Sequence, residues 1–155
     1  MKENMIVLTV IVFLLSMVAG ASVVDNGTHS EINGTGSAWF FVGSILSSFH
    51  DYSDSAKAFD KAIESNPNDG LAWFNKGKAL YFDGQYNESI RVLQKAIDID
   101  ADLSVKAWFY QGNAYFQLGN YTAADRTYTK AINLLESLNR TEISSETIGK
   151  ISYEG

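Results

Sequence analysis

The chain contains one sequence unit written three times. The tripeptide Ala-Trp-Phe begins at Ala38, Ala72 and Ala107, and Lys-Ala-Ile follows in the same register at Lys61, Lys95 and Lys130. A period of about 34 residues, with an aromatic residue and then a glycine one helical turn later, is typical of a solenoid built from helix-turn-helix units. Because such solenoids recognise other chains through an extended curved surface, the repeat predicts binding rather than catalysis.

The second copy shows how each unit is built. Its apolar residues recur at spacings of three and four, first around Trp73 and, after the Asp83-Gly84 break, around Leu93, which predicts two helices. We expect Asp69 to cap the first of them. The equivalent capping positions in the other copies are Thr35 and Ser104. Small residues are expected where the two helices of a unit approach closely; these pairs are Gly43 with Ser55, Gly77 with Ser89, and Gly112 with Ala124.

This order of residues resembles the tetratricopeptide repeat (TPR) family. The second copy matches the family pattern at Trp73, Gly77, Leu80, Gly84, Tyr86, Ser89, Leu93 and Ala96, and the third at Trp108, Gly112, Tyr115, Gly119, Tyr121, Ala124, Tyr128 and Ala131. In the first copy His50 replaces the turn glycine. Pro67 closes that copy, whereas the others have Ala101 and Glu136 there. The resemblance implies an all-α, right-handed helical solenoid of three repeats, at 36-69, 70-104 and 105-138, in one domain at 36-138.

The resemblance also implies a groove lined by the first helix of each repeat. In this family the residue after the tryptophan points into the groove, here Phe40, Phe74 and Phe109. The other groove residues implied are Ser44, Asn75, Lys78, Tyr81, Lys106, Asn113 and Phe116. An aromatic stripe beside hydrogen-bonding groups suits a peptide with apolar anchors, although the same spacing also occurs where aromatic residues pack as core. Of the five residues with which some members grip a terminal carboxylate, only Asn75 and Lys106 are present, too few for that clamp.

The N-terminus is unlike the repeats. Lys2 precedes an apolar run from Met5 to Val18, and Ala19-Gly20-Ala21 supplies the small residues of a signal-peptidase site. Residues 1-21 are therefore predicted to form an apolar helix that is either a cleaved signal peptide or an uncleaved membrane anchor, since about 20 uncharged residues can span a bilayer. Residues 22-35 read as a flexible polar linker. Residues 139-155 read as a C-terminal tail or a short capping helix beginning at Ser144 or Ser145.

Asn-X-Ser/Thr sequons agree with an extracytoplasmic location, because they are acceptors for glycans in exported proteins. The predicted glycosylation sites are Asn26, Asn33, Asn87, Asn120 and Asn139.

Composition excludes several other functions. The chain has no cysteine and a formal net charge of -6, with its basic residues scattered, which argues against a nucleic-acid partner. Asp98, Asp100 and Asp102 begin like a calcium loop, but Leu103 and Phe109 stand where that loop needs Gly and Glu. We find no catalytic or cofactor motif.

The sequence therefore predicts a non-catalytic scaffold without metal or cofactor, exported or membrane-anchored, that binds a protein or peptide in the groove. The alternative is a self-associating structural component, because terminal repeats leave apolar faces open. An enzyme or carrier of a small ligand would need a deep closed pocket, which an open groove does not offer.

Overall fold

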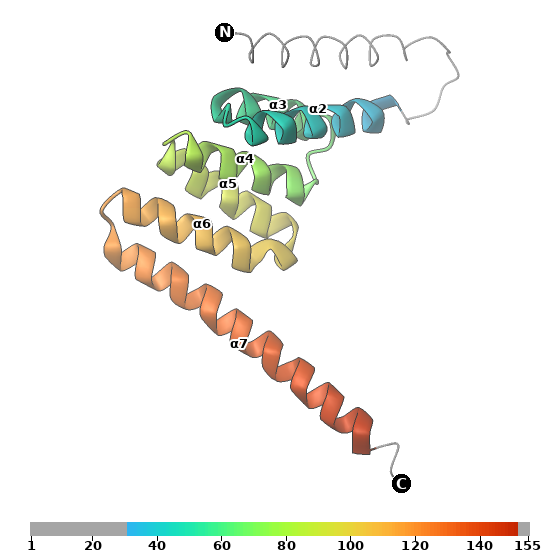
Figure 1. The fold of residues 1–155 in the computed structure, drawn as a ribbon, viewed down its shortest axis with the longest axis vertical. Coiled ribbons are helices and arrows are strands. Elements are labelled where there is room, and N and C mark those ends of the chain that lie inside the picture. Colours follow the sequence, from blue (N-terminus) through green and yellow to red (C-terminus); the bar gives the residue numbers. More distant parts are fainter. Residues whose placement is uncertain (1–30, 152–155) are drawn as a thin grey trace.

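The structure, a computed structural model, describes the backbone of residues 31–151 and the side chains of residues 36–139. This part of the chain holds six α-helices and one 3₁₀ helix and no strand. Figure 1 shows the α-helices stacked side by side in chain order, with α2 at one end and α7 at the other. The bounds are α2 Glu31–Ser48, α3 Tyr52–Ser65, α4 Gly70–Phe82, α5 Tyr86–Ile99, η1 Ala101–Leu103, α6 Ser104–Gln117 and α7 Tyr121–Ile151.

The helices form three consecutive pairs. α2 packs on α3, α4 on α5 and α6 on α7, while α3 also packs on α4 and α5 on α6. Each pair corresponds to one sequence repeat, so the predicted all-α arrangement of three helix-turn-helix units is confirmed in the described residues. The right-handed sense of the solenoid stays a prediction.

The close approach is as predicted in the first two pairs. The Ser89 hydroxyl, on α5, donates to the Gly77 carbonyl oxygen of α4 at 2.7 Å, and Ser55 on α3 donates to Gly43 of α2 at 2.8 Å. A Cβ atom at Gly77 would lie 2.6 Å from Leu93 Cγ. Only glycine therefore fits at this crossing.

The turns inside the pairs use a left-handed residue. Gly84 and Gly119 have φ values of 81° and 74°, and His50, at the equivalent place in the first pair, has a φ of 62°. A residue with a Cβ atom is disfavoured in this region, so the replacement of the turn glycine by His50 introduces local strain that the other two turns avoid.

The predicted helix caps are confirmed only in part. Asp69 accepts a hydrogen bond from the Ala72 N–H at 3.0 Å and caps α4 as expected. The prediction for Thr35 is wrong, because α2 already begins at Glu31 and includes it. The prediction for Ser104 is also wrong: α6 begins there without a side-chain cap, since the 3₁₀ turn η1 runs directly into it.

The connections between repeats differ from one another. The first connection is a short turn that contains Pro67, and the second is η1. Asp100 caps the start of η1 by accepting a hydrogen bond from the Asp102 N–H at 3.0 Å. At Glu136 there is no turn at all, because α7 continues to Ile151. A separate capping helix starting at Ser144 or Ser145 is therefore not formed.

The predicted linker 22-35 is partly helical, because α2 already begins at Glu31.

The core lies between successive pairs. Leu93 and Ala96 of α5 pack with Phe74 of α4, with Leu103 of η1 and with Ala107 of α6. A matching cluster joins Ala62 and Ile63 of α3 to Ala72 of α4. Helices of neighbouring repeats thus share one continuous core, as expected when each unit cannot bury its apolar face alone.

None of the helices within residues 31–151 is long and apolar enough to cross a membrane. The predicted leader at 1-21 and the sequon at Asn26 lie outside the described residues, and the side chain of Asn33 is also outside them.

Candidate functional site

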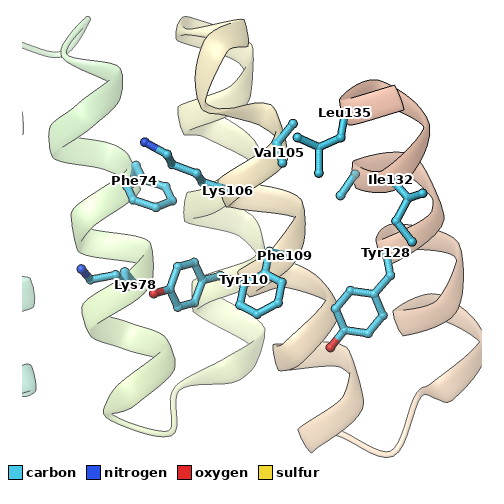
Figure 2. A pocket seen from close by; sticks show the side chains of 10 residues that line it. Phe74, Lys78, Val105, Lys106, Phe109, Tyr110, Tyr128, Ile132 and Leu135 are labelled. Atoms are coloured by element: carbon cyan, nitrogen blue, oxygen red, sulfur yellow. The ribbon is translucent and has the colours of Figure 1, made fainter. Parts of the chain in front are cut away.

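A cavity lined by residues of α4, α6 and α7 lies near the α7 end of the stack. It has a volume of about 790 Å³ and is almost wholly apolar. Figure 2 shows its residues on three helices, with the side chains of α6 in the middle and those of α7 along one side. We call this space the apolar cavity; it is lined by Phe74, Lys78, Val105, Lys106, Phe109, Tyr110, Tyr128, Ala131, Ile132 and Leu135.

The two aromatic residues at equivalent repeat positions differ strongly in exposure. Phe74 is 7% exposed and belongs to the core between α5 and α6, while Phe109 is 53% exposed. Phe74 is covered by Tyr110, whose ring centroid lies 5.9 Å away in an edge-to-face arrangement. Phe109 has Tyr110 beside it at 5.7 Å and Tyr128 of α7 at 6.3 Å, but no described helix of a further repeat covers it. Phe74 is thus mainly a packing residue, and Phe109 is an exposed part of the cavity wall.

Two lysines are the only charged residues that line the apolar cavity. Lys78 extends from α4 and Lys106 from α6, and Figure 2 shows both amino groups on the side away from α7. Neither forms an ion pair with a described residue, whereas Lys76 pairs with Asp60 at 2.6 Å. The site is therefore an apolar surface with two unpaired positive charges at one rim.

The tyrosines of the cavity are not acid–base groups at neutral pH. Burial raises the pKa of Tyr110 above its ordinary value, and repulsion by Tyr81 acts in the same direction. Burial likewise raises the pKa of Tyr128. The Tyr128 hydroxyl donates to the Asn113 Oδ1 at 2.6 Å. Both phenols therefore remain neutral and act by packing and hydrogen bonding.

A second, smaller cavity of about 330 Å³ lies between α2, α3 and α4, and about half of its wall is polar. We call it the polar cavity; Ser44, Ser47, Ser48, Tyr52, Phe59, Asn75, Lys78 and Phe82 line it. Lys78 borders both cavities. The Ser44 hydroxyl donates to the Phe40 carbonyl at 3.0 Å, and the Asn75 amide donates to the Leu71 carbonyl at 2.9 Å. The groove predicted from the sequence is thus divided into a polar and an apolar part.

The other predicted groove residues lie apart from these two cavities. Phe40 lines a further cavity of about 450 Å³ at the start of α4. Tyr81 packs against Tyr110, with ring centroids 5.7 Å apart. Phe116 is exposed near the turn between α6 and α7, against Tyr121 at 5.2 Å. The ten predicted residues therefore do not form one site.

Sequence reasoning missed the wall contributed by α7, which consists of Tyr128, Ala131, Ile132 and Leu135. A signal was present in the repeat register. Leu135 occupies the position that Asp100 has in the second copy, so the third copy is apolar where the second turns toward the next helix. The family resemblance implied a groove on the first helices only.

The cavities contain no constellation typical of catalysis or metal binding. No carboxylate or histidine lines the apolar or the polar cavity. Within the described residues, three or more His, Cys, Asp or Glu side chains are nowhere gathered as metal ligands would be. The Asp98, Asp100 and Asp102 series lies at η1, where Asp100 caps the turn.

Comparison with known families agrees with the geometry. Two family profiles, both described as tetratricopeptide repeat, match residues 43–104 and residues 105–138, together more than half of the chain. The chain therefore belongs to the tetratricopeptide repeat family. Repeats of this family typically mediate protein–protein interactions and are typically non-catalytic. No curated protein matches the sequence.

Several solved structures share the fold. A crystal structure of MamA is 22% identical, with a TM-score of 0.64, over 68% of this chain and 61% of that one. MamA from Desulfovibrio magneticus RS-1 is 24% identical, with a TM-score of 0.60, over 64% and 56%. YrrB, described as a TPR protein with an unusual peptide-binding site, is 23% identical, with a TM-score of 0.60, over 64% and 50%. This chain thus spans less than two thirds of each of these proteins, and at these identities the likeness is one of fold.

Proposed function

We propose that the chain is a non-catalytic scaffold that binds a protein or peptide partner along the first-helix face formed by α2, α4 and α6. The observation that carries this proposal is the apolar cavity with two unpaired lysines at its rim. In a chain of net charge -6, the charges that border the cavity are both positive. An open apolar surface with a few polar groups beside it is the usual form of a peptide-recognition groove.

The partner that this surface fits has apolar side chains and at least one acidic group. Apolar anchors bury surface in the cavity, while a carboxylate near Lys78 or Lys106 steers and orients the partner. Asn75 and Ser44, in the polar cavity, are placed to meet the polar backbone of an extended segment. YrrB has the same fold and is described as having a peptide-binding site, which supports peptide recognition on this fold.

Selection of peptides from a random library on the immobilised chain tests this proposal. We expect the selected peptides to combine apolar and acidic residues. A labelled synthetic peptide of this kind should bind Lys78→Gln and Lys106→Gln about tenfold more weakly, equivalent to about 1.4 kcal/mol, and with a smaller dependence on salt.

Lys95→Gln is the matched control, because Lys95 is an exposed lysine on α5, outside both cavities. It should leave the affinity unchanged. Failure to select any peptide, or equal affinity in all three lysine variants, would count against recognition at this face.

We also propose that the chain is exported or membrane-anchored. Support comes from the charge-free apolar run, the small residues at Ala19-Gly20-Ala21 and the sequons. Asn87, Asn120 and Asn139 are exposed, as a glycan acceptor must be. The Asn87 sequon includes Ser89, whose hydroxyl is buried on Gly77, so a glycan there must be added before α4 and α5 pack.

The mass of the protein purified from its native cells tests the location. A mature chain beginning at Ser22 indicates a cleaved signal peptide, and an intact N-terminus in a membrane fraction indicates an anchor. Recovery of the intact chain from the cytosol, without glycans, would contradict export in either form.

A further inference from the structure

The third repeat leaves open a position that the first two repeats fill. Ile63 of α3 is 8% exposed because α4 covers it, and Ile97 of α5 packs into the core shared with α6. Ile132 occupies the same repeat position on α7 and is 53% exposed. The second helix of each earlier repeat is therefore covered by the first helix of the next one, and α7 lacks this cover.

The apolar cavity is the open position itself. In the second repeat, Leu103 of η1 and the α6 residues Ala107 and Tyr110 cover Phe74, Leu93, Ala96 and Ile97. Their equivalents in the third repeat are Phe109, Tyr128, Ala131 and Ile132, all of which line the cavity. The cavity thus has the walls against which the first helix of a fourth repeat would pack.

The chain does not supply that helix from its own C-terminal side. A fourth first helix would require a turn near Glu136, where the first copy has Pro67. Instead α7 continues without interruption to Ile151, and Figure 1 shows it extending past the end of the stack. The occupant of the position must therefore come from elsewhere.

Helix α2, at the opposite end of the stack, lacks a neighbour of the kind that α7 could provide. It is a first helix, and within residues 31–151 no second helix of a preceding repeat packs against it. Phe41 of α2 is 56% exposed, and in the repeat register it corresponds to Tyr110, which covers Phe74. Ala38 corresponds to Ala107, which is fully buried against α5. Helix α2 therefore presents an alanine and an aromatic residue at the spacing with which α6 covers α5.

We propose that the α7 wall of the apolar cavity binds helix α2 of a second copy of this chain, head to tail, in the way that α6 packs on α5. This inference rests on the proposed function, because both treat the apolar cavity as a binding surface; here its occupant is helix α2 of a second copy. Because the two contacting surfaces are different, each copy keeps one open end, and repeated contacts build an open array. Helix α2 and the apolar anchors of a peptide therefore compete for the same cavity, and only the rim with Lys78 and Lys106, on the side away from α7, stays open when α2 is bound.

Two charge substitutions on opposite ends test this mode of association. Ile132→Asp removes the apolar wall and leaves α2 intact, while Phe41→Asp alters α2 and leaves the wall intact. Sedimentation velocity should show concentration-dependent association of the wild-type chain and a monomer for each variant. An equimolar mixture of the two variants should form a dimer, because the intact α2 of Ile132→Asp can bind the intact wall of Phe41→Asp. The dimer should grow no further, since each of its two free ends carries a substitution.

Leu118→Asp is the matched control, since Leu118 is an exposed leucine at the α6–α7 turn, outside the cavity lining. It should associate like the wild type. Helical circular dichroism must be the same in all variants, which is expected because the three substituted side chains are exposed or half exposed.

Cross-linking supplies a second measurement that does not depend on charge substitutions. The chain has no cysteine, so a chain with Phe41→Cys and a chain with Ile132→Cys carry one thiol each. A short bis-maleimide should cross-link the mixture into mixed dimers in preference to like pairs.

A wild-type monomer at all concentrations overturns the proposal. So does association that persists in Ile132→Asp, or a mixture of the two variants that stays monomeric. Loss of association in Ile132→Asp but not in Phe41→Asp also overturns it, and points to a segment other than α2, such as residues 1–30, as the occupant. None of these outcomes depends on peptide binding at the lysine rim, so the two proposals can fail separately.

Discussion

Three phenylalanines show that one repeat position can serve different purposes. Phe40 packs edge-to-face on Phe59 at 5.4 Å, Phe74 is buried between repeats, and Phe109 lies open in the apolar cavity. The residue type and its place on the helix are the same in each case. What differs is the neighbour: α6 covers Phe74, and no described helix covers Phe109. Exposure along the stripe is therefore decided by position in the stack.

The difference in exposure between Phe74 and Phe109 predicts that the same substitution lowers stability by different amounts at the two positions. Phe74→Ala should destabilise the fold by about 3–5 kcal/mol, because it opens a cavity in the core between repeats. Phe109→Ala should change stability by no more than about 0.5–1 kcal/mol, as for other exposed positions. Urea unfolding monitored by circular dichroism measures both. Equal losses in the two variants would mean that Phe109 is covered in solution.

The contact at Gly77 gives a second prediction at the residue scale. Gly77→Leu should destabilise by more than the roughly 1–3 kcal/mol of ordinary overpacking, because its Cβ atom alone would overlap the buried Leu93. The melting temperature should fall by well over 5 °C, on the scale of about 4–8 °C per kcal/mol for a domain of this size. Lys95→Leu places the same side chain on an exposed face and serves as control. An unchanged melting temperature for Gly77→Leu would exclude the close-packed pair.

At the scale of the elements, the turns between paired helices are the least uniform part of the repeat. Gly84 and Gly119 adopt the left-handed conformation without strain, and His50 adopts it with a side chain. The His50 ring lies edge-on to Tyr52 at 5.7 Å, a contact that offsets part of the strain.

We therefore predict opposite effects at equivalent turns. Gly84→Ala should destabilise by about 1–2 kcal/mol although its Cβ atom would meet nothing within 4 Å, because the penalty is conformational. His50→Gly should be neutral or stabilising by up to about 1 kcal/mol. Chemical unfolding of both variants tests this. Destabilisation by His50→Gly beyond that of Gly84→Ala would show that the contact with Tyr52 outweighs the strain.

The elements also show what the sequence could and could not predict. Repeat periodicity correctly placed the helix pairs, the break at Gly84, the cap at Asp69 and the contact of Gly77 with Ser89, since these depend on residues close in sequence or in the same unit. Ser104 was wrongly expected to cap α6, because the 3₁₀ turn before it already continues the helical path. The continuation of α7 past Glu136 could not be predicted from the loss of the proline alone, because Ala101 also replaces it in the second copy and α5 still ends at Ile99.

The site was harder to predict for a physical reason. Whether Phe74 or Phe109 is exposed depends on which helix follows, and whether α7 forms a wall depends on where it ends. Both are properties of the stack and not of a single repeat, so the ten groove residues implied by the resemblance divide between core, cavities and helix surface.

At the scale of the whole molecule, the stack has a middle and two unequal ends. Among the described helices, α4 and α5 have neighbours on both sides, whereas α2 and α7 have them on one side only. In a solenoid, each unit is stabilised mainly by its nearest neighbours. Local stability should therefore fall from the central pair toward both ends.

Amide hydrogen exchange measures this gradient. In the Ile132→Asp variant, which the proposed association leaves monomeric, we expect the slowest exchange in α4 and α5 and the fastest in α2 and in the part of α7 beyond Leu138, where no described helix packs against it. In the wild-type chain at high concentration, stacking should slow exchange in α2 and around Ile132 and leave α4 and α5 unchanged, because only the end helices gain neighbours. Leu118→Asp should follow the wild type. Uniform protection across all six helices in the monomer would contradict the gradient and show that the three repeats open only as one cooperative unit.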